Sequence, residues 1–168
     1  MTRILFVCLG NICRSTMAEY VMRHLVRERG LEGSIVADSA GTSTEEYGNP
    51  VHPGTQRVLA AHGIPCGGHR ARQMQRADYE AYDLLIGMDD ENRANMYRIL
   101  LGRGGWGWGG VSAAEAAKAD PAGKVRLLLD WSSRPRAIAD PWYTHDFETT
   151  YADVYEGCTT LLDALVGE

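Results

Sequence analysis

A short apolar run that leads straight into a cysteine-containing loop constrains the fold of this chain more than any other feature. Residues 4–7 read Ile-Leu-Phe-Val, which is typical of a strand buried on both faces of a parallel sheet. The run ends at Cys8. From Ser15 onward, apolar side chains recur at helical spacing until Gly30, which favours the end of a helix. A strand, a tight loop and a helix in this order indicate the start of an α/β fold.

Strands and helices alternate through the rest of the chain. Apolar runs predict further strands, and apolar positions three and four residues apart predict further helices. The predicted strands cover residues 35–37, 83–88 and 124–129, and the predicted helices cover residues 55–62, 92–101 and 147–166. A helical turn is the alternative for residues 124–129. This alternation indicates a parallel sheet with helices on both faces.

Length, charge and cysteine content narrow the class of protein. The chain has 168 residues with 17 basic and 22 acidic side chains, a formal net charge of −5, and its length predicts one domain over residues 1–168. Acidic charge spread along the chain argues against a nucleic-acid or membrane-surface binder, which would carry a basic stripe. The 4 cysteines are too few and scattered for a disulfide framework. No segment has the roughly 18 apolar residues of a membrane span, so we expect a cytoplasmic protein.

Residues 102–110 interrupt the alternation of strands and helices. The segment contains six glycines together with Trp106 and Trp108, a composition that fits no packed element. It follows the helix after the third strand, so we expect a surface loop at the amino-terminal edge of the sheet. Open α/β sheets bind ligands at the opposite edge. A partner-docking loop that uses the two tryptophans is the alternative.

Residues 8–15 can hold an anion and a nucleophile in one place. They lie between a strand and a helix N-terminus, where backbone N–H groups and the helix dipole attract anions. Arg14 adds a planar guanidinium that matches two phosphate oxygens. Cys8 shares this electropositive environment, which favours the reactive thiolate. Asn11 and Ser15 have side chains suited to hold the loop or to hydrogen-bond to the sulfur.

Each of these residues also has an ordinary structural interpretation. Cys8 can be a buried thiol at the end of a strand, and Arg14 a surface charge. Asp140 precedes Pro141, a pair that commonly begins a turn. For Cys8 and Arg14, the apolar strand, the glycine in the loop and the helix start at Ser15 together favour the anion-binding interpretation. For Asp140 taken alone, the turn is favoured.

The same residues resemble the signature of a known family. Residues 7–15 read Val-Cys-Leu-Gly-Asn-Ile-Cys-Arg-Ser, with Met-Ala-Glu at residues 17–19, and this is similar to the low-molecular-weight protein tyrosine phosphatases. The similarity continues in order through residues 38–43, 62–64, 69–73, 88–89 and 140–143. It therefore covers nearly the whole chain. It implies a four-stranded parallel sheet of order 2-1-3-4 with the phosphate-binding loop after the first strand.

The resemblance implies a protein tyrosine phosphatase that needs no metal or other cofactor. Cys8 would attack phosphorus and form a phosphocysteine, while Arg14 stabilises the transferring group and Asp140 acts as general acid and then as base. Ser39 and His69 are implied to support the phosphate-binding loop. The remaining loop residues implied to bind phosphate are Leu9, Gly10, Asn11, Ile12, Cys13 and Ser15.

Specificity is implied by the residues around the pocket. Trp142 and Tyr143 would form an aromatic wall beside the leaving group. Members commonly have an aromatic residue on the other wall, where this chain has Glu45 and Glu46, with Tyr47 next in sequence as a candidate replacement. An acidic rim favours basic phosphopeptides over acidic ones. The expected partners are phosphotyrosine-containing proteins, a tyrosine kinase among them, and the expected state is a monomer or weak dimer.

Cys13 resembles the second loop cysteine of many members, which pairs reversibly with the nucleophile Cys8. Such a disulfide protects a thiolate from over-oxidation. A thiol at the start of a helix with no role of its own is the alternative.

Other functions on the same fold remain as alternatives. Thioredoxin-coupled arsenate reductases need a further pair of cysteines on a flexible segment, whereas Cys66 and Cys158 lie far apart in this sequence. Protein-arginine phosphatases tend to carry Thr in place of Ile12 and smaller residues after the Asp-Pro pair. A non-catalytic phosphate-ligand module would need neither Cys8 nor Asp140, and no nucleotide-binding glycine motif follows the first strand.

Overall fold

Parallel strands form one sheet in the order β2-β1-β3-β4. The computed structural model describes residues 1–107 and 109–167. The strands are β1 (Thr2–Cys8), β2 (Ile35–Gly41), β3 (Leu84–Gly87) and β4 (Val125–Leu127). The predicted α/β class and strand order, and the predicted place of the cysteine loop after the first strand, are confirmed.

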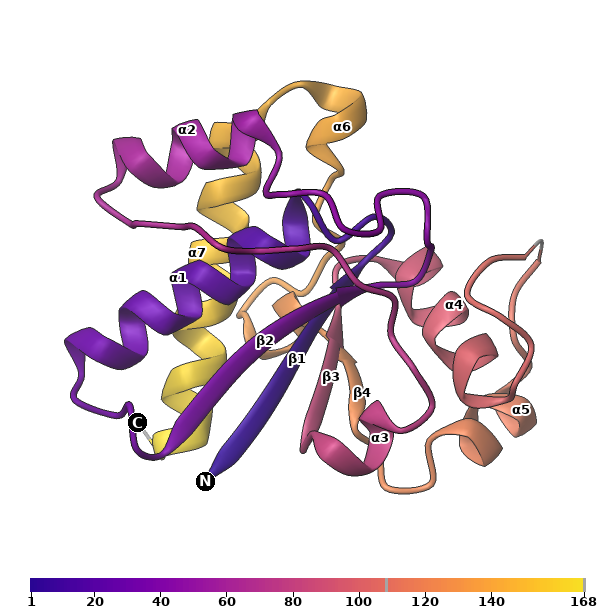
Figure 1. Ribbon diagram of the computed structural model, residues 1–168. Helices are drawn as coiled ribbons and strands as arrows, with labels where there is room; N and C mark the ends of the chain where they lie inside the picture. The colour runs from indigo at the N-terminus through magenta and orange to yellow at the C-terminus, as the bar shows by residue number, and fades with distance from the viewer. Residues whose placement is uncertain (108, 168) are drawn as a thin grey trace.

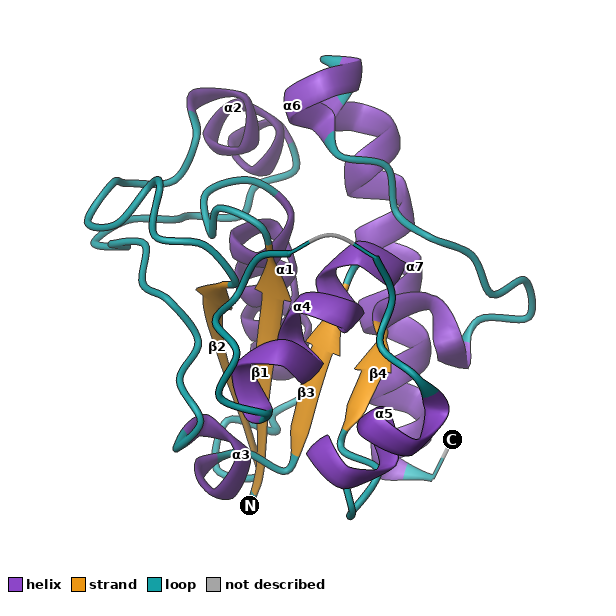
Figure 2. Cartoon of the chain, turned by 90° about the vertical axis from the view of Figure 1, so that its right-hand side faces the viewer, coloured by secondary structure: helices purple, strands orange, loops and turns teal. Residues whose placement is uncertain are grey.

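Helices cover both faces of this sheet (Figures 1 and 2). They are α1 (Arg14–Glu28), α2 (Pro53–Ala61), α3 (Asp78–Ala81), α4 (Asp90–Leu100), α5 (Ala113–Ala119), α6 (Pro141–Thr144) and α7 (Phe147–Val166). In Figure 1, α1 and α7 lie together on one side of the sheet and α4 and α5 on the other. No helix of the described residues is long and apolar enough to cross a membrane.

Strand β1 divides its side chains between two cores. Ile4 and Phe6 pack in the core that includes side chains of α1 and α7, whereas Leu5 and Val7 pack in the core that includes side chains of α4. Successive side chains of a strand point to opposite faces, so an uninterrupted apolar run is needed where both faces are covered. All four side chains are 0% exposed, which fixes β1 in the middle of the sheet and Cys8 at its carboxyl edge.

The predicted elements differ from the observed ones mainly at short helices. Residues 124–129 combine both predicted alternatives, because β4 is followed by a 3₁₀ helix, η1 (Leu128–Trp131). Helices α3, α5 and α6 are not predicted from the sequence, because they have only four to seven residues each and thus little periodicity. Helix α5 nevertheless carries a readable signal, a capping box between Ser112 and Glu115.

The glycine-rich segment reaches the opposite edge of the sheet from the expected one. Gly105 packs so closely against the carbonyl oxygen of Thr42 that a Cβ would not fit. Thr42 directly follows β2, and its N–H donates to the carbonyl oxygen of Cys8 (2.9 Å), so this contact lies at the carboxyl edge. The predicted position is wrong, because the chain after α4 turns back along that helix (Figure 2). Trp106 is 57% exposed, and Trp108 lies outside the described residues.

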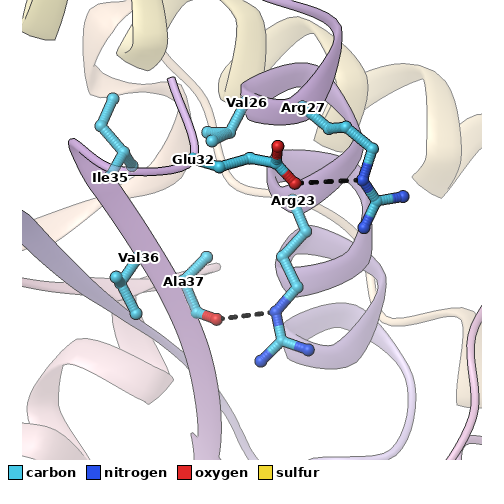
Figure 3. A pocket seen from close by; sticks show the side chains of 7 residues that line it. All are labelled: Arg23, Val26, Arg27, Glu32, Ile35, Val36 and Ala37. Carbon is cyan, nitrogen blue, oxygen red and sulfur yellow. Dashed lines mark hydrogen bonds and ion pairs between the residues drawn. The ribbon is translucent and has the colours of Figure 1, made fainter. Parts of the chain in front are cut away.

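The outer edge of β2 is partly covered by a side chain of α1. The Nε atom of Arg23 donates to the carbonyl oxygen of Ala37 (2.9 Å), and Arg27 pairs with Glu32 beside it at 3.4 Å (Figure 3). A cation over an edge strand hinders pairing with another chain. The pocket that these side chains line shares no residue with the pocket that contains Cys8, so the two are separate.

Candidate active site

The phosphate loop, residues 8–15, turns carbonyl groups toward the surrounding protein. The carbonyl oxygens of residues 8, 9, 11 and 12 all accept hydrogen bonds from other segments. The donors are, in that order, the N–H of Thr42 (2.9 Å), the N–H of Ser43 (3.0 Å), the Nε2 atom of His69 (2.8 Å) and the N–H of His52 (2.9 Å). With its carbonyl groups held outward, the loop can direct its N–H groups at an anion.

Asn11 holds the loop from within. It adopts a φ of 60°, in the left-handed region that asparagine tolerates better than most residues, and it is 0% exposed. Its side-chain amide donates to the hydroxyl oxygens of Ser15 and Ser39, both at 2.9 Å, and its Oδ1 accepts the N–H of Arg72 at 3.0 Å. Ser39 and His69, the predicted supporting residues, thus both contact Asn11.

Cys8 ends β1 with its sulfur in a polar environment. The sulfur lies 3.0 Å from the hydroxyl oxygen of Ser15. Because Asn11 already donates to that oxygen, the hydroxyl proton of Ser15 is free to donate to the sulfur. The N-terminus of α1 adds positive potential at the same place. Both features place a hydrogen-bonding hydroxyl and positive potential beside the sulfur.

Arg14 is oriented by acceptors on two other segments. Its Nη1 donates to Asp89 (2.6 Å) and to the carbonyl oxygen of Ile138 (2.9 Å), and its Nη2 contacts Asp140 at 3.3 Å. Burial alone would lower the pKa of the guanidinium, but the anionic groups around it, Cys8 foremost, raise it above its ordinary value. The side chain is 3% exposed, so it is fixed beside Cys8 before any ligand arrives.

Asp140 and two aromatic residues follow one another at the start of α6. The Oδ1 atom of Asp140 accepts the N–H of Trp142 (3.0 Å) and so caps this helix, as its position before Pro141 predicts. The Oδ2 atom faces Arg14. Trp142 is 51% and Tyr143 73% exposed, so their rings are free to contact a substrate.

These segments enclose a single cavity of about 110 Å³. Its lining combines the loop, the acid and the aromatic residues: Cys8, Leu9, Gly10, Ile12, Cys13, Arg14, Glu45, Glu46, Asp140, Trp142 and Tyr143. Tyr47 is 71% exposed and lies outside this lining, so the structure does not bring it into the pocket with the other predicted residues. Within the described residues, no group of three or more His, Cys, Asp or Glu side chains could hold a metal ion.

Comparison with known proteins assigns the family. The model of the low molecular weight phosphotyrosine protein phosphatase family matches residues 3–103. The chain belongs to this family. Low molecular weight protein-tyrosine-phosphatase YfkJ from Bacillus subtilis is 39% identical over 170 residues, which cover 100% of this chain and 98% of YfkJ.

Solved structures agree with this membership in the low molecular weight phosphatases. The crystal structure of YfkJ has a TM-score of 0.83 at 37% identity, covering 99% of this chain and 96% of YfkJ. The crystal structure of a Drosophila arginine phosphatase has a TM-score of 0.76 at 28% identity, covering 98% of each chain. The predicted resemblance is therefore confirmed, and with it a cysteine-dependent protein tyrosine phosphatase whose substrates are phosphoproteins.

Two carboxylates of this phosphatase, the buried Glu19 and the half-buried Asp89, have no role predicted from the sequence. Asp89 holds Arg14, and Glu19 accepts a hydrogen bond from the Ser39 hydroxyl at 2.6 Å. Burial raises the pKa of Glu19, while Ser39 and Arg23 act in the opposite direction. Asp89 follows the third strand of a parallel sheet, whose carboxyl end carries the ligand site, and this position is the signal that could have identified it.

Proposed function

We propose that this chain hydrolyses phosphotyrosine in proteins through a phosphocysteine on Cys8. The Cys8 thiolate attacks phosphorus, so that an S–P bond forms as the P–O bond to the tyrosine ring breaks. Asp140, initially protonated, gives its proton to the departing phenolate oxygen. Asp140 then accepts a proton from water, whose oxygen attacks phosphorus and releases inorganic phosphate and the thiolate. Arg14 and the loop N–H groups stabilise charge on the equatorial oxygens in both steps.

One observation carries this proposal: Cys8, Arg14 and Asp140 line the same cavity, although Asp140 is far from the other two in sequence. An attacking sulfur and a proton donor for the leaving oxygen are both needed for an aryl phosphate ester. Trp142 and Tyr143 add aromatic surface at the mouth of the cavity, which suits a phenyl ring better than an alkyl chain.

Cys8, rather than its neighbour Cys13, is the nucleophile in this proposal. Both cysteines line the cavity, and both are free thiols. Burial, and to a lesser extent the charges of Cys8 and Asp140, raise the pKa of Cys13 to about 12. A thiol with this pKa is protonated at neutral pH and is a weak nucleophile.

The test is turnover of matched phosphotyrosine, phosphoserine and phosphoarginine peptides and of p-nitrophenyl phosphate, measured with a metal chelator present. Phosphotyrosine should be hydrolysed fastest and the chelator should not slow it. A clear preference for phosphoarginine would favour the activity of the Drosophila relative instead. No hydrolysis of any peptide by folded, reduced protein would contradict a phosphatase.

Replacing Asp89 with asparagine should weaken catalysis while preserving helix α4. The Oδ1 atom of Asp89 accepts the N–H of Asn92 at 2.7 Å as the cap of α4, and asparagine retains this acceptor. The charged bond from Arg14 is lost, and such bonds contribute about 1.5–3 kcal/mol. We expect kcat/KM to fall about 10- to 100-fold and inorganic phosphate to inhibit less. Asp90→Asn, at an exposed neighbour, should leave both unchanged.

Replacing Glu46 with glutamine should change KM for a small phosphate ester and KM for a peptide substrate in opposite directions. The side chain of Glu46 packs near Gly10 of the loop, and its carboxylate accepts a hydrogen bond from Asn49 at 2.6 Å, which fixes a negative charge at the cavity. That charge repels a bare phosphate ester and attracts a basic group beside the phosphotyrosine. In Glu46→Gln, KM for p-nitrophenyl phosphate should fall about threefold and KM for a peptide with flanking arginine should rise about threefold.

The control for Glu46→Gln is Glu28→Gln, which changes net charge equally at the far end of α1. Glu28→Gln should leave both KM values unchanged. Both effects of Glu46→Gln should shrink at high salt, because screening shortens the reach of exposed charges. Equal shifts in the same direction for both substrates would rule out charge recognition by Glu46.

Composition and family membership support a proposal about the location and partners of this protein. We propose a cytoplasmic location, and phosphotyrosine proteins, including a tyrosine kinase, as partners of a monomer or weak dimer.

The proposed unit is one domain spanning residues 1–168, with residues 102–110 as a surface loop. Most described residues of that segment are exposed, in support of a surface loop, and Gly105 anchors it beside Thr42.

A further inference from the structure

His52 lies where three segments around the cavity meet. It precedes α2, which in both overall views lies beside α6 above the carboxyl ends of the strands (Figures 1 and 2). The three segments are the phosphate loop, the first turn of α2, and residues 140–147, which we name the acid loop because they begin with Asp140. His52 is not among the residues lining the cavity, so any effect on the reaction must pass through its neighbours.

The backbone and the ring of His52 join two of these segments. Its N–H donates to the carbonyl oxygen of Ile12 in the phosphate loop at 2.9 Å. Its Nδ1 atom accepts the N–H of Gly54 at 2.9 Å and thereby caps α2. A histidine held at both its backbone and its ring nitrogen has little freedom to rotate, so its ring is a rigid surface for whatever packs on it.

The acid loop packs on this ring at two points. Phe147 stacks on His52 with ring centroids 5.2 Å apart and an interplanar angle of 19°. Trp142 contacts it edge to face, at 5.8 Å and 78°. Gly54 allows this approach, because a Cβ there would overlap the Phe147 ring. The two aromatic residues lie near opposite ends of the acid loop, so one ring restrains the whole segment.

The restraint reaches Asp140 through Trp142. The N–H of Trp142 donates to Oδ1 of Asp140 at 3.0 Å, which leaves Oδ2 directed at Arg14. Between the two ring contacts, His145 adopts a φ of 59°, a left-handed conformation that non-glycine residues rarely take without support from their surroundings. The acid loop therefore depends on its contacts for the conformation that presents Asp140.

We propose that His52 is a positioning residue whose ring fixes the acid loop against the phosphate loop, so that Asp140 meets the leaving-group oxygen. The proposal rests on the proposed function, in which Asp140 protonates that oxygen. The side chain of His52 does not line the phosphate cavity, and replacing it with asparagine or phenylalanine retains the backbone N–H that donates to Ile12. Removal of the His52 ring is therefore expected to lower kcat/KM most for esters whose leaving group needs a proton, and least for esters with a stable leaving anion.

The experiment compares His52→Asn, His52→Phe and wild type on phenyl phosphate and p-nitrophenyl phosphate. Asparagine retains an acceptor for the N–H of Gly54 but removes the ring, whereas phenylalanine retains a ring and removes the acceptor. In His52→Asn, kcat/KM should fall about tenfold for phenyl phosphate and less than threefold for p-nitrophenyl phosphate. His52→Phe should recover most of the loss. The inhibition constant of inorganic phosphate should stay within twofold in both variants.

His62→Asn is the matched control. His62 follows the other end of α2 and stacks on Tyr151 of α7, with ring centroids 3.8 Å apart. It also pairs with Glu148 of α7, so it joins α2 to α7 outside the acid loop. It should leave the ratio of the two kcat/KM values unchanged. The proposal is overturned if His52→Asn keeps the wild-type ratio of kcat/KM for the two esters, or if it weakens inhibition by phosphate.

The proposed function is judged separately in the same experiment. Wild type must hydrolyse both esters, and Asp140→Asn must steepen the dependence of kcat/KM on the leaving group. If wild type meets both conditions and His52→Asn keeps the wild-type ratio, only the role of His52 is wrong. If Asp140→Asn leaves the ratio unchanged, the general acid assignment fails, and the role of His52 fails with it.

Discussion

Cys8→Ser should abolish phosphotyrosine turnover and leave the pocket able to bind phosphate. A serine hydroxyl remains protonated at neutral pH, and the side chain in hydrogen-bond contact with the Cys8 sulfur is the hydroxyl of Ser15, which is no base. We expect kcat to fall by at least about 10⁴-fold, as losses of an enzyme nucleophile commonly do. The loop is held by Asn11 and by bonds to its carbonyl groups, none of which uses the sulfur. Calorimetry should therefore show phosphate bound at least as tightly as by wild type.

Cys13→Ser distinguishes the two cysteines of the cavity. Because the raised pKa of Cys13 keeps it a thiol, its replacement should cost less than about tenfold in kcat. Mass spectrometry of acid-quenched wild type during turnover should find phosphate on the peptide that contains Cys8. Turnover that survives Cys8→Ser and disappears in Cys13→Ser would move the nucleophile to Cys13.

The phosphate loop could be predicted from sequence because its chemistry is local. Residues 4–15 contain the buried strand, the nucleophile, the left-handed Asn11 and the arginine at the helix start, so a short window specifies their arrangement. The parallel sheet could also be predicted locally, because a strand buried on both faces must be apolar throughout its length. Asp140, a long way along the chain, was predicted only through the family resemblance.

Contacts that depend on how distant segments pack could not be predicted from the residues themselves, although the family resemblance implied that Ser39 and His69 support the loop. Asp89 and Ile138 reach Arg14 from two different segments. The contact of Gly105 with Thr42 places the glycine-rich loop at the edge of the sheet opposite to the predicted one. The composition of the loop does not indicate in which direction the chain turns after α4. Tyr47 was predicted to replace an aromatic wall, but a shift of one residue leaves Glu46 at the cavity and Tyr47 in solvent.

Asp140→Asn should slow the reaction by about 10²- to 10⁴-fold without disturbing the fold. Asparagine keeps the oxygen that accepts the N–H of Trp142, so the cap of α6 is retained. It cannot release a proton to the leaving oxygen, and it cannot accept one from water. The loss should therefore affect both steps. In kcat/KM, which reports the first step, it should be largest for phenyl phosphate, whose leaving anion is the more basic.

Asp146→Asn is the control within the same segment. Asp146 caps α7 through the N–H of Thr149 at 3.0 Å, is exposed, and lies outside the cavity, so its amide variant should retain wild-type kinetics. The decisive comparison is between substrates: a general acid makes p-nitrophenyl phosphate the less affected ester. An Asp140→Asn variant that slows both esters by the same factor in kcat/KM would show that Asp140 only orients Arg14, which its Oδ2 atom contacts. Proton donation would then have to come from the acidic rim at Glu45 and Glu46, the remaining carboxylates that line the cavity.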